Sequence, residues 1–153
     1  MRIIEKFEDF GPITLAMLAE KFSAVEDAVD LALDLGASDI ETEAVMLCPT
    51  DAGELAQSIK KNKVGELNYE IGSHLEYAAS VEFGSRPHWA PKKAIEEWAM
   101  RKGLDEAAAE MIWISIGVKG TQAHPFLRPA FQKYKEPIIK QVIEAIGRGL
   151  QDG

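Results

Sequence analysis

One long apolar stripe near the start of the chain limits what this sequence can fold into. From residue 13 onward, apolar side chains recur at steps of three and four, which places them on one face of a helix. Gly36 interrupts the pattern, and Ser38 stands three residues before Glu41, the spacing of a capping box. We therefore expect a long helix that bends or breaks near Gly36 and stops before Pro49. The stripe consists of Leu15, Leu18, Phe22, Val25, Val29 and Leu33, and it resumes at Ile40, Ala44 and Leu47.

The middle of the chain alternates turn residues with short periodic segments. Residues 49–59 contain Pro, Asp and Gly in a pattern that predicts a turn. Apolar side chains alternate with polar ones over residues 64–71, which predicts short strands in a hairpin. Residues 76–84 fit either a further strand or a single helical turn that Gly84 ends, because periodicity does not separate the two in so short a run.

Three more helices are expected in the second half. One begins near Pro91, since Pro suits a first helical turn, and ends at Gly103. Asp105 caps the next helix, and a last helix follows the segment of residues 124–131, with an apolar stripe whose first member is Leu127 and with Pro137 as a kink or restart. The predicted fold class is α+β in a single domain over residues 1–153. A long N-terminal helix and a C-terminal helix pack on a small antiparallel sheet, with a helical insert at about residues 90–120.

Charge is spread unevenly along the chain. The formal net charge is −8, yet residues 1–56 hold 13 acidic and 3 basic side chains, while the remainder is nearly balanced. An acidic half repels phosphate, so sequence-specific nucleic-acid binding is not expected. The charge excess fits a solvated helix surface or a face that packs on a less acidic neighbour. No apolar run reaches the ~20 residues that a membrane span needs, and the first residues do not resemble a secretory signal.

No arrangement of side chains in the sequence predicts catalysis, a cofactor or a metal. Cys48 is the only cysteine, which excludes a disulfide or a cysteine-based zinc site within one chain. The three histidines, at positions 74, 88 and 124, are far apart and lack metal-ligand spacing. There is no nucleophile elbow and no Gly-rich phosphate loop. We therefore do not expect an enzyme; a small hydrolase is the disfavoured alternative.

Aromatic and arginine side chains gather around loops punctuated by Gly and Pro. Trp and Arg are frequent anchors of protein interfaces. Trp98 and Trp113 lie on helical stripes and are expected in the core, whereas Trp89 and Phe126 stand in loops and fit either core or interface. Arg86 is beside a proline and can reach a carbonyl or a carboxylate.

Three motifs, in order, resemble those of a known family. The first is the Pro–x–x–Thr–Gly–x–Leu–x–x–Ser–Ile turn of residues 49–59, with Ala52 where the family has Thr. The second is Glu–Phe–Gly–Ser at residues 82–85, and the third is Pro–Phe–Leu–Arg–Pro–Ala at residues 125–130. Together they resemble the tail-component family of long-tailed phages, also described as neck or head–tail joining proteins, whose namesake is gene product ten of a lambdoid phage. The resemblance covers about residues 12–150.

The resemblance implies a non-enzymatic protein of the virion, made in the cytoplasm of the bacterial host and encoded by a phage or a prophage. Its partners would be head-closure or connector proteins and tail proteins, and it would form or join a homo-oligomeric ring. Two alternatives stay open: a tail terminator that caps the tail tube, and a prophage protein that binds a host partner. Residues expected in the interface or in structural motifs are Gly53, Glu82, Phe83, Gly84, Arg86, Trp89, Pro125, Phe126, Arg128 and Pro129.

Three structural expectations follow. Gly53 and Gly84 should adopt backbone conformations that side chains with a Cβ resist. The guanidinium of Arg128 should pair with the carboxylate of Glu82 and so tie the second motif to the third. Because no apolar stripe is left once the core is built, the isolated protein should be monomeric or weakly associating, with Trp89, Phe126 and Arg86 contacting partners.

Overall fold

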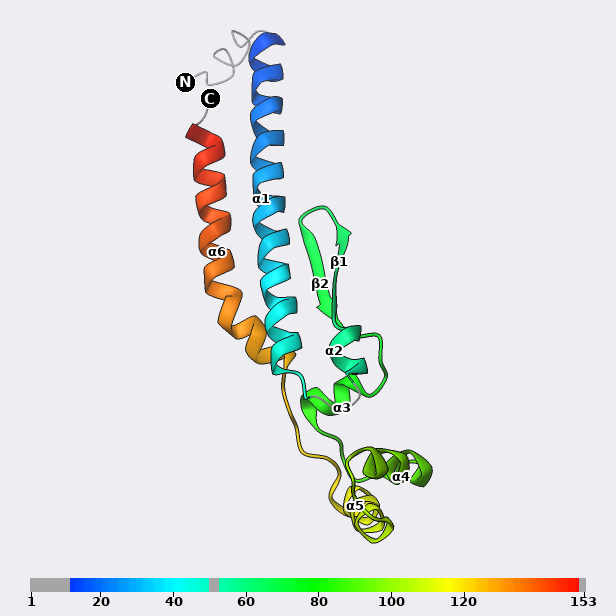
Figure 1. Ribbon diagram of the computed structural model, residues 1–153. Helices are drawn as coiled ribbons and strands as arrows, with labels where there is room; N and C mark the ends of the chain where they lie inside the picture. The colour runs from blue at the N-terminus through cyan, green and yellow to red at the C-terminus, as the bar shows by residue number, and fades with distance from the viewer. Residues whose placement is uncertain (1–11, 50–52, 152–153) are drawn as a thin grey trace, which may run out of the picture. The chain divides into compact units, whose positions relative to one another are not determined.

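The fold is mostly helical with one small sheet, as expected for an α+β chain (Figure 1). It is seen in a computed structural model that describes residues 12–49 and 53–151. In chain order the elements are α1 (Pro12–Leu47), α2 (Glu54–Ser58), β1 (Lys60–Gly65), β2 (Asn68–Gly72), α3 (Ala78–Phe83), α4 (Lys92–Arg101), α5 (Glu106–Lys119) and α6 (Leu127–Gln151).

The described residues form two compact units. The helix-pair unit comprises residues 12–43, 60–72 and 130–151, and the motif unit comprises residues 44–49, 53–59 and 73–129. The motif unit holds the described residues of the first motif, the whole second motif and all but the last residue of the third.

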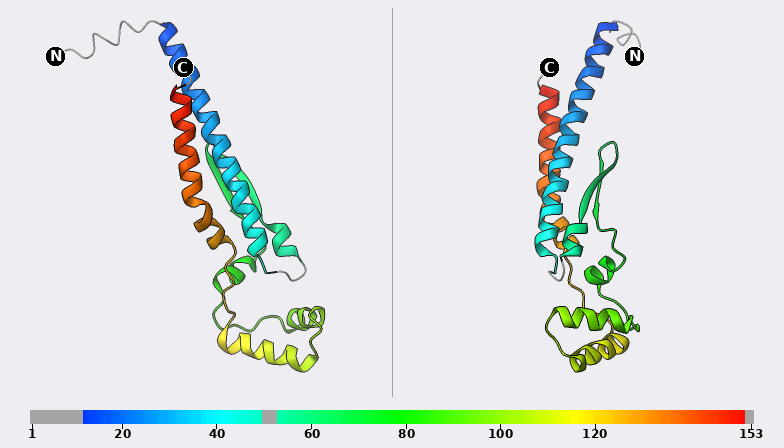
Figure 2. Two further views of the ribbon diagram at one scale, coloured as in Figure 1. Left: turned by 60° about the vertical axis from the view of Figure 1, so that its left-hand side comes forward. Right: turned by 45° about the vertical axis from the view of Figure 1, so that its right-hand side comes forward.

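In the helix-pair unit, α1 and α6 lie side by side in all views (Figures 1 and 2). Helix α1 runs through Gly36 without the predicted break. A Cβ at Gly36 would overlap the side chain of Ile138, so this glycine lets α6 approach closely and does not interrupt the helix. Ser38 likewise does not begin a new helix, because its hydroxyl donates to the carbonyl of Asp34 one turn earlier, at 2.9 Å.

The predicted hairpin forms and covers part of the acidic face of α1. Strands β1 and β2 pair antiparallel, with Lys60 opposite Gly72 and an irregularity between Lys63 and Gly65. Lysines on β1 reach carboxylates on α1: the Nζ atoms of Lys61 and Lys63 lie 2.6 Å from Asp34 and Asp30 respectively. The hydrogen bond from Lys63 lowers the pKa of Asp30. The acidic excess of the first half is thus partly matched inside the fold.

Helix α6 continues through Pro137 and does not restart there. Proline has no N–H to donate to the carbonyl of Lys133, so the helix loses one internal hydrogen bond at this point. Figure 1 shows the axis of α6 turning within its orange segment, which fits the predicted kink.

Candidate assembly sites

The second and third sequence motifs meet at the buried carboxylate of Glu82. Its side chain is only 6% exposed. One oxygen accepts hydrogen bonds from the backbone N–H groups of Phe126 and Leu127, at 2.8 and 2.9 Å, and the other accepts from the N–H of Arg128 at 2.9 Å. Leu127 and Arg128 begin α6 and Phe126 directly precedes it; N–H groups at the start of a helix have no partner within the helix. We call this arrangement the Glu82 junction.

The electrostatics of the junction favour an ionised carboxylate. Burial of Glu82 raises its pKa, but the backbone donors of Leu127, Phe126 and Arg128 lower it, and the net shift is downward. The positive end of the α6 dipole acts in the same direction. Glu82 therefore stabilises the start of α6 as a charged cap.

The prediction that the guanidinium of Arg128 pairs with the carboxylate of Glu82 is wrong. The two motifs are tied together, but the carboxylate binds backbone N–H groups, and the guanidinium of Arg128 instead lies over the ring of Phe83, 5.2 Å from its centroid. Phe83 and Arg128 are both exposed. They form a cation–π pair on the surface directly outside the junction.

Glycines let the two chain segments beside the junction approach each other. Ser85 and Thr121 exchange two backbone hydrogen bonds, at 3.1 and 3.2 Å. Gly84 precedes this bridge with φ +73°, and a Cβ there would lie 2.6 Å from the carbonyl oxygen of Thr121. Gly120, with φ +79°, would collide with the carbonyl of Ser85 if it carried a Cβ. The expectation for Gly84 is confirmed.

The first motif forms a short helix in place of the predicted turn. Gly53 has φ +78°, as expected, and α2 follows it directly, whereas residues 50–52 lie outside the described part of the chain. Leu55, Ser58 and Ile59 are buried, and the Ser58 hydroxyl lies 2.6 Å from both the carbonyl oxygen of Leu55 and the hydroxyl of Ser73. The motif supplies core residues.

Of the three predicted partner anchors, Phe126 is buried and the other two are exposed. Phe126 is 2% exposed, so the expectation that it contacts a partner is wrong: it belongs to the core beside the junction. Trp89 is 60% exposed and packs against Trp113, with ring centroids 4.6 Å apart and ring planes inclined by 47°. Arg86 is exposed, as is Pro125, whereas Pro129 is half-buried.

The helical insert formed by α4 and α5 follows the expected pattern. The carboxylate of Asp105 accepts from the N–H of Ala108 at 2.8 Å and caps α5. The indole of Trp113 donates to the carbonyl of Ala90 at 2.8 Å. The outer face of α5, with Met111, Ile114 and Val118, remains exposed.

The sequence argument that no apolar stripe is left over is wrong. On α6, Ile139, Ile143, Ile146 and Leu150 are all exposed and step by four, three and four along one face. The spacing is visible in the sequence, but these residues lie beside the inward-facing stripe that includes Ile138 and Val142. We call these four residues the α6 ridge.

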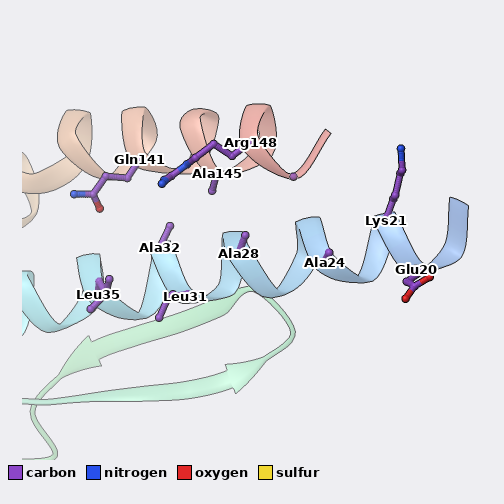
Figure 3. A pocket seen from close by; sticks show the side chains of 11 residues that line it. Glu20, Lys21, Ala24, Ala28, Leu31, Ala32, Leu35, Gln141, Ala145 and Arg148 are labelled. Atoms are coloured by element: carbon purple, nitrogen blue, oxygen red, sulfur yellow. The ribbon is translucent and has the colours of Figure 1, made fainter. Parts of the chain in front are cut away.

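A groove also opens between α1 and α6 within the helix-pair unit, with a volume of about 680 Å³ (Figure 3). Alanines of α1 and Ala145 of α6 point toward each other across it, and Leu31 and Leu35 also line it. Charged and polar residues complete the lining: Glu20, Lys21, Gln141 and Arg148. We call it the α1–α6 groove.

The described ranges were searched for side chains that could hold a metal ion. Across residues 12–49 and 53–151, no group of three or more His, Cys, Asp or Glu side chains is placed to hold a metal ion. Cys48 is buried, and burial raises the pKa of its thiol. None of the helices in these ranges combines the length and apolar character needed to cross a membrane.

Residues 15–84 match the family model described as "Bacteriophage HK97-gp10, putative tail-component". The match runs from the first turns of α1 to Gly84, and so includes the first motif and the Glu–Phe–Gly of the second. Over these residues the chain is similar to this phage tail-component family, and the resemblance inferred from the motifs is confirmed there. A search of curated proteins and a search of solved structures each give no match.

Proposed function

We propose that this chain is a non-enzymatic structural protein of a tailed-phage particle that acts where head and tail are joined. The match of residues 15–84 to a phage tail-component family carries this proposal. The exposed apolar faces of α5 and α6 support it, because contiguous apolar surface on a folded chain marks an interaction site.

The partners proposed for this role are head-closure or connector proteins on one side and tail proteins on the other. The surface outside the Glu82 junction suits such contacts, since the Phe83–Arg128 pair is exposed there; Arg86, two residues after Gly84, is exposed as well. Arginine and aromatic side chains are frequent anchors of interfaces, and the junction beneath holds their backbone in place. The protein would be made in the bacterial cytoplasm. Its copies would assemble in a ring in the particle and remain in the virion.

The test is removal of the gene from its phage or prophage, followed by electron microscopy of the particles. A joining role predicts filled heads and finished tails that remain separate. Overlong tails would instead identify a tail terminator, and normal particles would favour a prophage protein that binds a host partner.

A charge reversal then tests the proposed contact surface. Arg86→Glu should reduce the yield of joined particles in complementation at least tenfold. The matched control is Lys93→Glu, which makes the same reversal on an exposed residue of α4 and should leave the yield unchanged. Equal yields from the two variants would remove Arg86 from the contact surface.

A further inference from the structure

The β1–β2 hairpin lies on α1 without a buried side chain of its own. All of residues 60–72 are described, and each is half-buried or exposed, including the apolar Val64 and Leu67. Figures 1 and 2 show the hairpin beside α1 in every view. A two-stranded hairpin is only marginally stable by itself in water, so its place on α1 depends on contacts other than core packing.

The strongest of these contacts are ion pairs with a matched spacing. The Nζ of Lys61 lies 2.6 Å from a carboxylate oxygen of Asp34, and the Nζ of Lys63 lies 2.6 Å from one of Asp30. The two lysines are two residues apart on a strand, about 6.6 Å, and the two aspartates are four residues apart on a helix, about 6 Å. Because these spacings are nearly equal, both lysines reach a carboxylate at the same time.

Hydrogen bonds from the same face of the hairpin add to the ion pairs. The hydroxyl of Tyr69 donates to Asp30 at 3.1 Å, and the ammonium of Lys61 donates to the hydroxyl of Ser38 at 2.7 Å. The carboxylate of Glu41 accepts from the backbone N–H of Lys61 at 2.7 Å. The length of the hairpin is therefore held on α1 chiefly by charged and polar groups.

Solvent reaches these ion pairs. The side chain of Lys63 is 49% exposed, and Lys60, whose Nζ lies 3.8 Å from Glu41, is 64% exposed. Ion pairs in such positions are weak, and salt shortens the range of their attraction from about 10 Å at 0.1 M to about 3 Å at 1 M. The attachment of the hairpin to α1 should therefore weaken as the salt concentration rises.

The base of the hairpin is fixed in a different way. Ser58 and Ser73 lie on either side of it, and their hydroxyl oxygens are 2.6 Å apart. Ser58 is buried, as is Ile59, the residue directly before β1. At the other end, Gly72 has open space around it. None of these groups is charged, so salt does not screen the contacts that hold the base.

We propose that the β1–β2 hairpin is an ionically held arm, which leaves α1 as one piece when its ion pairs are screened while its base stays fixed. Local opening of this kind occurs where few buried apolar contacts must break, and the rest of the fold remains intact. Opening uncovers Asp30 and Asp34 on α1 and Lys61 and Lys63 on the arm, four charges that the closed chain pairs with one another. The inference concerns the chain itself and does not depend on the proposed function.

The test is the distance between the tip of the arm and α6 in the full chain. Spin labels on Glu66→Cys and Ile143→Cys, both at exposed positions, report this distance by pulsed electron paramagnetic resonance, and Cys48→Ala removes the other cysteine. We expect one narrow distance at about 0.05 M NaCl and a second, broader population at about 1 M. The ratio of closed to open arms should fall roughly tenfold between the two.

Charge exchange at one pair provides the controls. Lys63→Glu places a second carboxylate against Asp30 and should open the arm even at low salt. Adding Asp30→Lys to that variant restores opposite charges in exchanged order and should close the arm again. Lys93→Glu makes the same reversal on α4 and should leave the arm closed.

Any of three results would overturn the inference. The distance is the same at both salt concentrations; or Lys63→Glu leaves the arm closed; or Asp30→Lys fails to close the arm that Lys63→Glu has opened. Circular dichroism at both salt concentrations supplies a further check, since helix content should stay constant. Loss of helix together with release of the hairpin would mean that the arm does not open by itself, and would equally contradict the proposal.

Discussion

The Glu82 junction and the α6 ridge are opposite in construction. At the junction a buried carboxylate has three backbone donors, and the neighbouring segments are held by a backbone bridge beside two glycines. Along the ridge, four apolar side chains contact solvent in the single chain. The buried motif residues, such as Glu82 and Phe126, thus hold the chain to itself, whereas the exposed ridge lies outside the three motifs.

The largest expected effect is loss of the cap at the junction. Glu82→Ala removes the acceptor of three backbone N–H groups at a site where water has little access. We expect a loss of about 3–5 kcal/mol in the free energy of unfolding, because unpaired buried donors keep their desolvation cost. Urea titration measures it. Glu82→Gln keeps one acceptor oxygen and should lose less; equal losses from the two variants would contradict the capping role.

A smaller loss is expected where Gly84 approaches the opposite segment. Gly84→Ala forces a residue with a Cβ into φ +73° and against the carbonyl of Thr121, at an expected cost of about 1–3 kcal/mol. Gly103 has a similar φ of +72° with open space around it, so Gly103→Ala serves as a reference for a positive φ without a close contact. The difference between the two variants in thermal unfolding measures the close contact. Equal losses of thermal stability in the two variants would show that the segments around Gly84 and Thr121 are not in close contact.

The helix pair should respond to glycine substitution in two directions. Gly36→Ala introduces a methyl group into the space of Ile138 and should destabilise the protein, despite the better helix propensity of alanine. Gly147→Ala meets nothing within 4 Å and should stabilise the protein by up to about 1 kcal/mol. Calorimetry of both variants decides. Stabilisation by both would mean that α1 and α6 are not in close contact at Gly36.

The smallest effect is the response of the junction to acid. The folded pKa of Glu82 lies below its usual value of 4.5, so its contribution to stability is complete above that value and is lost as the pH falls through the lower, folded pKa. The stability difference between the unaltered chain and Glu82→Gln should therefore shrink on acidification below about pH 4.5. A difference that is constant from pH 7 to strong acid would contradict an ionised cap.

The sequence predicted local elements well and tertiary contacts poorly. The helical stripes, the hairpin alternation and the Asp105 cap depend on neighbours within four residues or on a short turn, so they are visible in a single chain. Gly36 was misread as a helix break, because the residue that requires a glycine there is Ile138, about a hundred residues away in the sequence. The partner of Glu82 was misread as the Arg128 guanidinium. The order of the motifs suggests that the second and third motifs meet, but it does not show which atoms make the contact.

The misreading of the surface has a different cause. Helix α6 carries apolar residues on two adjacent stripes, and only the packing of α1 reveals which stripe is covered. Ile138 faces α1, whereas Ile139 and Ile143 do not. We expected a monomer because no apolar stripe remained for an interface once the core was built. The exposed α6 ridge removes this reason. The sequence also left undecided whether Phe126 lies in the core or in an interface, because a loop position alone does not determine burial.

Urea unfolding of Glu82→Gln and Ile143→Glu, run side by side, tests most directly whether the motif residues build the fold while the α6 ridge does not. We predict that Glu82→Gln unfolds at lower urea than the unaltered chain, and that Ile143→Glu, whose side chain is 63% exposed, unfolds at the same urea concentration as the unaltered chain. The reverse pattern, in which the ridge variant unfolds early and the junction variant does not, would contradict this division of roles.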